Sequence, residues 1–225
     1  MIKAILALAG LALIVPGAAD ARSTKAAPKK KAAVAAPASV PLMPSAAAVR
    51  VADWIAASGD NGALPYAVID KTTASLFLFD AKGKSLGAAP VLLGIAIGDD
   101  ATPGVGSKKL GEIGPAEKTT PAGRFLAKYG WAAGRQKVLW VDYANSVALH
   151  AIPADASKTE HRRRRMLSPT SDDNRITFGC INVPKAFYGK IVRPLFQKNG
   201  GYVYVLPDIK PLEAVFPRLR LFRPS

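Results

Sequence analysis

The chain has a single cysteine, Cys180, within the segment Thr177-Phe178-Gly179-Cys180-Ile181-Asn182. A thiol has a pKa of about 8.5 and becomes an effective nucleophile only beside a base or a cation. His150 is a candidate base, because it ends the apolar run Val147-Ala148-Leu149, which predicts a strand that would fix the imidazole. These residues predict covalent catalysis by a Cys–His pair. The spacing alone leaves a second interpretation open, in which Cys180 is a small buried side chain in a strand.

The second histidine, His161, is the weaker candidate for the base. It opens the run His161-Arg162-Arg163-Arg164-Arg165, whose charges predict a solvated, mobile segment. A general base must lie within hydrogen-bond reach of the proton that it removes. We therefore expect His150, rather than His161, to pair with the thiol.

Gly179, immediately before the cysteine, has no Cβ and therefore permits a sharp turn and the close approach of a substrate. The backbone N–H groups of Gly179 and Cys180 are expected to face the substrate carbonyl and to stabilise the negative charge that develops on its oxygen. No metal or other cofactor is expected, because two histidines without carboxylates at ligand spacing do not suggest a zinc site.

Short β-rich runs, bounded by turn residues, must position these side chains. The expected strands are 67–70, 74–80, 90–97, 123–129, 137–143, 146–152 and 202–206, with a hairpin loop at 81–84 and a Gly-rich loop at 98–121. One helix is expected from 184 or 185 to about 197, with Pro194 kinking it or separating its last turn. The pattern predicts a mainly β domain with one main helix packed on the sheet.

Several segments are expected to flank this domain. Residues 1–21 combine a positive start, an apolar run and a small-residue cleavage pattern, which predict a secretory signal peptide. The alternative is a retained membrane anchor, but the apolar run is shorter than the ~20 residues of a spanning helix. Residues 22–45 predict a disordered Ala/Pro/Lys linker, and 46–62 a short helix and turn. The expected catalytic domain is 63–209, and a basic C-terminal tail, 210–225, follows it.

Charge and cysteine content bear on location and partners. The net charge of +15 is unchanged by removal of residues 1–21, which takes away Lys3 and Asp20. We expect an exported protein of the periplasm or cell envelope, without a transmembrane segment after cleavage, in which a lone thiol is unusual. The positive charge favours anionic envelope polymers as partners, with a merely solvated surface as the alternative. Nucleic acid is not expected, because the basic runs lack interleaved aromatic residues.

The segment around Cys180 resembles the catalytic motif of the L,D-transpeptidases, in which Ser or Thr, His, Gly, Cys, an apolar residue and Asn or Arg follow an earlier histidine. The matching residues are Thr177, Gly179, Cys180, Ile181 and Asn182. Two other segments are similar to parts of the same domain: 68–80 to its opening hairpin, and 118–125 to its Thr-Pro-x-Gly-x-Phe segment. The resemblance spans roughly residues 65–207, with these segments in the family's order.

This resemblance implies an L,D-transpeptidase-like β-sandwich that acts on the stem peptides of peptidoglycan. Cys180 would attack the carbonyl before the terminal D-alanine, and His150 would serve as general base and then as general acid. The acyl group would pass to an amine or to water. The candidate substrate-binding residues are Thr177, Phe178, Asn182 and Arg175. Arg175 suits a substrate carboxylate, although a structural salt bridge is an equally good interpretation.

In such a mechanism the second ring nitrogen of His150 needs an acceptor that fixes the tautomer. A backbone carbonyl beside Ala151 or Ile152 is one candidate. The carboxylates of Asp172 and Asp173 are the others.

Two features depart from the family. Phe178 replaces a histidine that generally supports the site, and the 26 residues between His150 and Thr177 make a longer loop than is usual. The extra length, which includes Glu160 to Arg165, is expected to form a lid or a docking surface for an acidic partner. The departures leave an alternative function open: a catalytically weakened or inactive envelope protein that keeps the fold and binds peptidoglycan.

Overall fold

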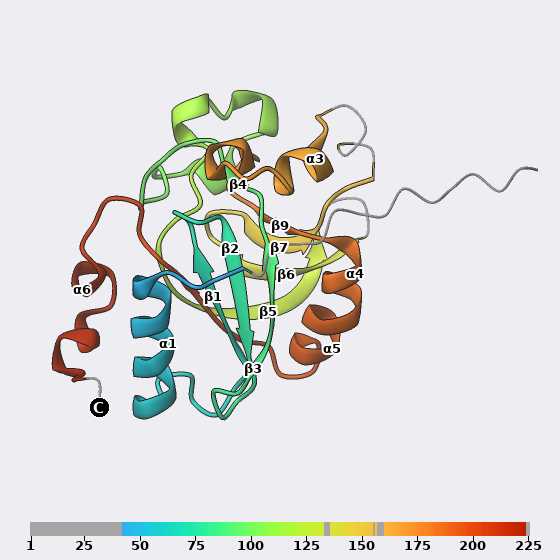
Figure 1. Cartoon of the computed structure of the whole chain (residues 1–225). Helices are drawn as coiled ribbons and strands as arrows, with labels where there is room; N and C mark the ends of the chain where they lie inside the picture. The colour runs from blue at the N-terminus through green and yellow to red at the C-terminus, as the bar shows by residue number, and fades with distance from the viewer. Residues whose placement is uncertain (1–41, 133–135, 155, 157–159, 224–225) are drawn as a thin grey trace, which may run out of the picture. The chain divides into compact units, whose positions relative to one another are not determined.

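A mixed sheet of eight strands positions the other elements (Figure 1). The protein is represented by a computed structural model that describes residues 42–132, 136–154, 156 and 160–223. The strand order is β3-β2-β1-β10-β5-β6-β7-β9, with β1–β10 and β7–β9 parallel and the other neighbours antiparallel. The strands are β1 Tyr66–Asp70, β2 Ser75–Phe79, β3 Ser85–Pro90, β5 Gly123–Ala132, β6 Gln136–Asp142, β7 Val147–Ala151, β9 Ile181–Val183 and β10 Gly201–Val205. A separate parallel pair joins β4, Leu93–Gly94, to β8, Arg175–Thr177.

The two halves of this sheet share one apolar core. Ile69 of β1 and Leu78 of β2 belong to the same buried cluster as Leu139 of β6, Leu149 of β7 and Val183 of β9. Alternate residues of a strand point to the same face, so each strand contributes every second side chain to this core. One continuous sheet therefore supplies both layers of the expected sandwich. The prediction of a mainly β fold is confirmed.

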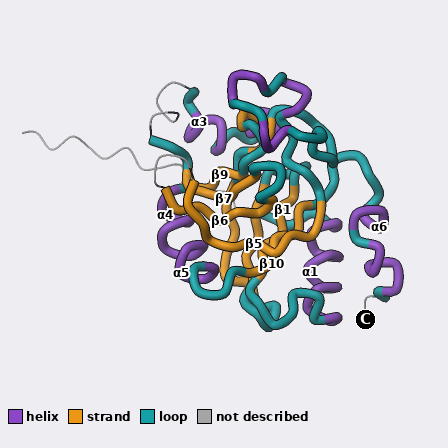
Figure 2. Tube along the Cα trace, turned by 180° about the vertical axis from the view of Figure 1, so that it is seen from behind, coloured by secondary structure: helices purple, strands orange, loops and turns teal. Residues whose placement is uncertain are grey.

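The main helix, expected from 184 or 185 to about 197, packs against this core (Figure 2). It consists of α4 Lys185–Phe187, a π-helical turn η6 Tyr188–Val192, and α5 Arg193–Phe196. Tyr188, Val192 and Phe196 are its buried contacts. Pro194 has no N–H and its ring opposes the carbonyl four residues earlier. The wider π turn directly before Pro194 accommodates both the missing hydrogen bond and the proline ring. The helix therefore continues through its last turn, α5.

A second core lies on the outer face of β1, β2 and β10, beneath helix α1, Ala46–Ser58. The helix begins where the Ser45 side chain accepts a hydrogen bond from the Ala48 N–H (3.1 Å), and ends at Gly59, which has a left-handed φ of 66°. Trp54 and Ile55 are buried against Tyr204 and other outward side chains of the sheet. The helix is thus an integral layer of the folded unit.

The segment expected as a basic tail, 210–225, is folded as far as it is described. It forms α6, Leu212–Val215, and a 3₁₀ segment η7, Pro217–Leu221, beside α1 (Figure 1). Phe216 and Leu219 are buried in the second core, whereas Arg218, between them, is exposed. Apolar residues recur at intervals of three and four along this segment, as in a half-buried helix.

The connection before the long loop also differs from expectation. The strand expected at 90–97 is divided: Pro90 is the last residue of β3, and Leu93–Gly94 forms the short β4. The Val91–Leu93 run is buried and apolar because the chain crosses the core there, with Leu92 bridging to Asn182. The loop 98–121 contains three short 3₁₀ turns, η1 Val105–Ser107, η2 Leu110–Glu112 and η3 Pro115–Glu117.

The connection between β7 and β8 contains a short helix, α3 Arg162–Met166, and a 3₁₀ turn, η5 Ser171–Asn174. Among the residues that the structure describes, no helix has the length and apolar character needed to cross a bilayer. The expected signal peptide, 1–21, and most of the expected linker, 22–45, lie outside the described residues.

The C-terminal segment offers a direct test of the second core. Leu219→Ala should lower the free energy of unfolding by about 2–5 kcal/mol, because Leu219 is 0% exposed and its removal leaves a cavity. Leu221→Ala is the matched control: Leu221 is 87% exposed, so its replacement should change stability by less than about 0.5 kcal/mol. Urea unfolding of both variants measures the difference. Equal stabilities would mean that this segment does not pack on α1.

Candidate active site

The parallel pairing of β7 with β9 brings the histidine and the cysteine to neighbouring chain segments. His150 of β7 is in register with Asn182 of β9, and Cys180 directly precedes β9. Cys180 is partly exposed, and its sulfur lies 3.7 Å from the carbonyl oxygen of Ser146, at the start of β7. Between these two described residues there is no hydrogen bond: the thiol faces Ser146, and the imidazole faces Asn182.

The loop from Thr177 to Cys180 is fixed by one hydroxyl group. Thr177 Oγ1 donates to the carbonyl of Cys180 (2.6 Å) and accepts from the N–H of Gly179 (3.2 Å). Gly179 has a φ of 121°, and a Cβ at this position would lie 2.6 Å from the carbonyl oxygen of Thr119. Only glycine meets both conditions without strain. The Gly179 N–H is already bonded inside the loop, which differs from the expected contact with a substrate oxyanion.

The neighbouring segment Thr119-Thr120 holds this loop from outside. Thr120 Oγ1 donates to the carbonyl of Gly179 (2.9 Å) and accepts from the N–H of Gly94 (2.9 Å). The hydroxyl thus joins the cysteine loop to β4. Thr120 lies in the segment 118–125, which resembles the Thr-Pro-x-Gly-x-Phe segment of the L,D-transpeptidases. Its role here is to support the cysteine loop.

The imidazole of His150 is held by partners on both ring nitrogens. Nδ1 lies 2.8 Å from the carbonyl oxygen of Ala151, which can only accept, so Nδ1 carries the hydrogen. Nε2 lies 3.2 Å from Nδ2 of Asn182 and therefore accepts. Of the acceptors considered from the sequence, the Ala151 carbonyl is the one used. His161, the other histidine, is exposed.

Burial favours the neutral form of both the His150 imidazole and the Cys180 thiol. Burial lowers the pKa of His150, and the positive charge of Arg162 lowers it further, against a hydrogen bond to Ala151 that raises it. Burial also raises the pKa of the Cys180 thiol, although a hydrogen bond at Ala148 and the charge of Arg162 oppose that rise. At neutral pH the site therefore contains a thiol and a neutral imidazole, not a preformed ion pair.

Arg162 is the site residue that sequence reasoning missed. The run 162–165 was expected to be solvated, and Arg163 and Arg164 are exposed. Arg162, however, is 8% exposed and donates from Nη1 to Oδ1 of Asn182 (2.7 Å). Its spacing of four residues from the buried Met166 places both on one face of α3, and that helical spacing was the available signal.

Three of the four expected substrate-binding residues have other contacts. Thr177 and Asn182 are buried, and their polar atoms are bonded within the site. Arg175 forms an ion pair with Asp208 (2.6 Å), so the salt-bridge interpretation fits this residue. Phe178 is 37% exposed, and the ammonium group of Lys118 lies 3.8 Å from its ring centroid. Of these four, Phe178 is the one in a position to touch a ligand.

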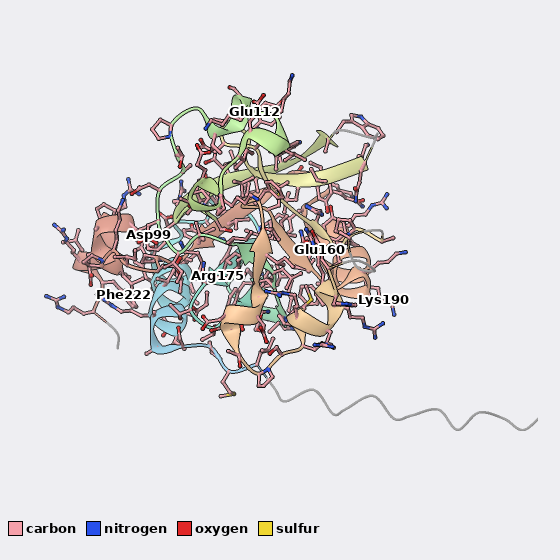
Figure 3. All side chains as sticks on the ribbon, turned by 90° about the horizontal axis from the view of Figure 1, so that it is seen from above. Asp99, Glu112, Glu160, Arg175, Lys190 and Phe222 are labelled. Carbon is pink, nitrogen blue, oxygen red and sulfur yellow. The ribbon has the colours of Figure 1, made fainter. Side chains whose placement is uncertain are left out.

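A buried network of charges anchors the loop that carries Thr120. Lys71 Nζ donates to Asp99 Oδ1 (3.0 Å) and to the carbonyl of Thr120 (3.0 Å), and lies 3.1 Å from Asp208 Oδ2. Burial disfavours the charge of Asp99, but N–H groups of residues 208–210 and the Lys71 ammonium outweigh it and lower the Asp99 pKa to about 2. Arg175 completes the network through Asp208, so two cations face two anions; Asp99 and Arg175 are labelled in Figure 3.

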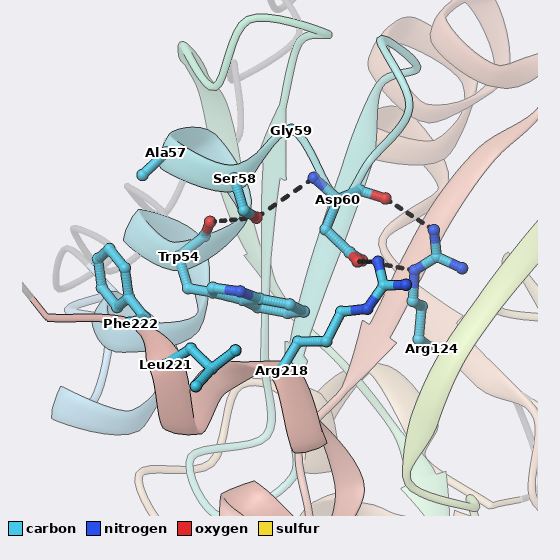
Figure 4. A pocket seen from close by; sticks show the side chains of 9 residues that line it. All are labelled: Trp54, Ala57, Ser58, Gly59, Asp60, Arg124, Arg218, Leu221 and Phe222. Atoms are coloured by element: carbon cyan, nitrogen blue, oxygen red, sulfur yellow. Dashed lines mark hydrogen bonds and ion pairs between the residues drawn. The ribbon is translucent and has the colours of Figure 1, made fainter.

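A hollow of about 510 Å³ lies elsewhere, beside the end of α1 (Figure 4). Arg124 and Arg218 both approach Asp60 there, and Trp54 lines one side. The chain's only thiol is not among the residues around it, so this hollow is not the candidate active site. Within the part of the chain that the structure describes, no three His, Cys, Asp or Glu side chains are grouped as metal ligands.

Comparisons with known proteins give matches among solved structures alone. No protein-family model matches the chain, and no curated protein matches it. Solved structures do match. The chain is similar in structure to L,D-transpeptidase catalytic domains.

Three of the matching structures illustrate the extent of this similarity. The L,D-transpeptidase of Xylanimonas cellulosilytica is 12% identical, with 63% of this chain and 60% of that chain covered and a TM-score of 0.36. The catalytic domain of the E. faecium L,D-transpeptidase is 16% identical, with 63% and 96% covered and a TM-score of 0.36. The helical cell shape determining protein Pgp2 of Campylobacter jejuni is 16% identical, with 71% and 56% covered and a TM-score of 0.44. The match thus spans 60% of the first of these chains.

The conformation of the cysteine loop predicts a large effect of a small substitution. Gly179→Ala should destabilise the fold by about 2 kcal/mol or more, because the added methyl meets the Thr119 carbonyl in a backbone conformation that only glycine favours. Gly189→Ala is the control, since its Cβ would meet nothing within 4 Å, and it should be neutral or stabilising by up to about 1 kcal/mol. Thermal or urea unfolding distinguishes the two. Equal tolerance of both changes would disprove the described loop geometry.

The neutral state of the site predicts how the lone thiol reacts with pH. The midpoint for alkylation of Cys180 by iodoacetamide should lie at higher pH in the folded chain than in the urea-unfolded chain, because burial raises its pKa. Stability should fall as pH rises above the unfolded thiol's pKa, and also as pH falls below that of an unfolded histidine, because His150 has a lowered pKa. Since Cys180 is the only cysteine, modification reports on one site. A folded-state midpoint below the unfolded one would contradict this description.

Proposed function

We propose that the chain is an exported cysteine acyltransferase of the L,D-transpeptidase type that acts on peptidoglycan stem peptides. The observation that carries the proposal is the parallel β7–β9 pair, which brings the chain's only thiol and a strand-held imidazole to adjacent segments. The ordered sequence motifs at 68–80, 118–125 and 177–182 support the same reaction class. Phe178, which is partly exposed and lies two residues before Cys180, is the proposed substrate contact.

The reaction begins when His150 Nε2 takes the proton of the Cys180 thiol. The sulfur attacks the carbonyl between the L-centre of a diamino acid and the terminal D-alanine, and forms a C–S bond. His150 then returns the proton to the amine of D-alanine as the C–N bond breaks, which leaves a thioester on Cys180. An amine of a neighbouring stem, or water, attacks the thioester and restores the thiol.

The proposed cycle starts from the arrangement described above. His150 is already neutral and can accept a proton, as a general base must. To do so, Nε2 must exchange its contact with Asn182 for the thiol, and Cys180 must leave Ser146. Hydrogen bonds of this kind often tighten into catalytic geometry only when substrate is bound.

A second candidate function is an envelope protein that binds peptidoglycan without turning it over. The observation that favours it is the same resting geometry, in which thiol and imidazole are each bonded to another group and the thiol pKa is raised. The exposed cations Arg163 and Arg164 would then contribute to retention on anionic envelope polymers. Binding of this type should weaken steeply with salt and persist in Cys180→Ala.

Intact-mass analysis with muropeptides tests the proposal. The native chain should form an adduct that has lost D-alanine, and Cys180→Ala should form none. His150→Gln should lower turnover by about 100-fold or more, the usual contribution of a positioned general base, whereas His161→Gln should retain activity. If the folded native chain neither forms the adduct nor alters stem peptides, catalysis is excluded. Salt-sensitive sacculus binding by Cys180→Ala would then favour the second function.

A further inference from the structure

Arg162 is buried in a segment whose neighbouring arginines are exposed. Its Nη1 donates to Oδ1 of Asn182 (2.7 Å), and its Nε is paired with Glu160. A buried guanidinium is strongly unfavourable unless it is paired and hydrogen-bonded, so these contacts specify where the side chain lies. The described hydrogen bond of the Cys180 thiol goes to Ser146 and not to Arg162, and the reaction described above assigns Arg162 no proton transfer.

The contact with Arg162 fixes the orientation of the Asn182 amide. A guanidinium has donors and no acceptor, so the amide oxygen, and not the NH₂ group, must face Arg162. The NH₂ group of Asn182 is then directed at His150, where Nδ2 lies 3.2 Å from Nε2. With a donor on that side, the ring nitrogen facing Asn182 must be unprotonated.

The other side of the ring agrees with this assignment, because Nδ1 faces the Ala151 carbonyl (2.8 Å) and carries the hydrogen. We propose that Arg162 is a positioning residue of the active site: through Asn182 it holds His150 as the neutral tautomer with hydrogen on Nδ1 and an unprotonated Nε2. The inference rests on the proposed function for its purpose, since Nε2 is the atom that would take the thiol proton.

The positive charge of Arg162 acts on His150 in the same direction. Arg162 lies on α3, its anionic partner Glu160 precedes that helix, and Cys180 lies before β9. On β6, the neighbour of β7, the Lys137 ammonium is held 4.9 Å from the ring centroid of Trp131. Burial is the main cause of the lowered pKa of His150, and the cation of Arg162 adds to it. The same cation opposes the raised pKa of Cys180.

This arrangement also assists the second half of the reaction. Once Nε2 has taken the thiol proton it can no longer accept from the Asn182 NH₂ group, so the resting contact cannot form again until that proton is passed on. The imidazolium is also disfavoured by the like charge of Arg162. The proton therefore passes readily to the amine of the leaving group, after which the starting hydrogen bonds form again.

NMR of ¹⁵N-histidine-labelled full-length chain tests the proposal without any substrate. His150 in the native chain should show the Nδ1–H tautomer at neutral pH. Arg162→Met, which keeps side-chain length but removes donors and charge, should move protonation of His150 to higher pH and release the fixed tautomer. Arg162→Lys should restore most of the native behaviour. Arg164→Met is the matched control, because it removes the same charge from an exposed position on α3 and should change neither property.

Enzyme kinetics and alkylation of the thiol accompany the NMR. In Arg162→Met, kcat should fall by about tenfold, part of the contribution of a positioned base, and the acidic limb of its pH profile should move to higher pH with little change in KM. Iodoacetamide alkylation of Cys180 should also shift to higher pH, because the cation that opposed the raised pKa is gone.

The outcomes separate this inference from the proposed function. An Nε2–H tautomer in the native chain, or an unchanged His150 titration in folded Arg162→Met, overturns the role of Arg162 whatever the activity. If Arg162→Met does not fold, the native tautomer together with Arg162→Lys still decides. Absence of Cys180-dependent turnover in the native chain would instead overturn the proposed function, and the tautomer measurement would stand on its own.

Discussion

The ammonium group of Lys71 is buried where four distant segments of the chain meet. It follows β1, and its partners are oxygens of Gly98, Asp99, Thr120 and Asp208. Removing such a charge from water is costly, so the network persists only because every member is paired. The geometry that results is specific: the loop 98–121 is tied at both ends to the sheet. Through the Thr120 hydroxyl, that constraint reaches the backbone of the cysteine loop.

The cysteine loop itself depends on short-range geometry that the sequence displays. The glycine before the cysteine indicated a sharp turn, and it has that role; Thr177, which was expected to contact substrate, fixes the same turn with its hydroxyl. Strand-held His150 also follows from local apolar patterning. These elements could be predicted because each depends on residues close in sequence, where backbone conformation and side-chain alternation are determined locally.

The parts that could not be predicted depend on contacts between distant residues. Nothing near Lys71 indicates that Asp99 and Asp208 will neutralise it, and Arg162 looks like three other arginines beside it. In the C-terminal segment the basic residues indicate a solvated tail, whereas the apolar residues spaced among them pack in the second core. The position of a charged side chain is set by whether a distant partner can pair with it, and one-dimensional patterns contain little information about that.

The parallel pairing of β7 and β9 has a consequence for the segment that joins them. Parallel strands cannot be joined by a tight turn, so the chain between His150 and Cys180 must make a crossover whatever its length. The sheet fixes both ends of that crossover, and additional residues in a closed loop add little entropic penalty. The length and sequence of that crossover can therefore change while the register of the two strands is kept. In this chain the crossover contributes Arg162, so a substitution there alters the environment of His150 without replacing His150.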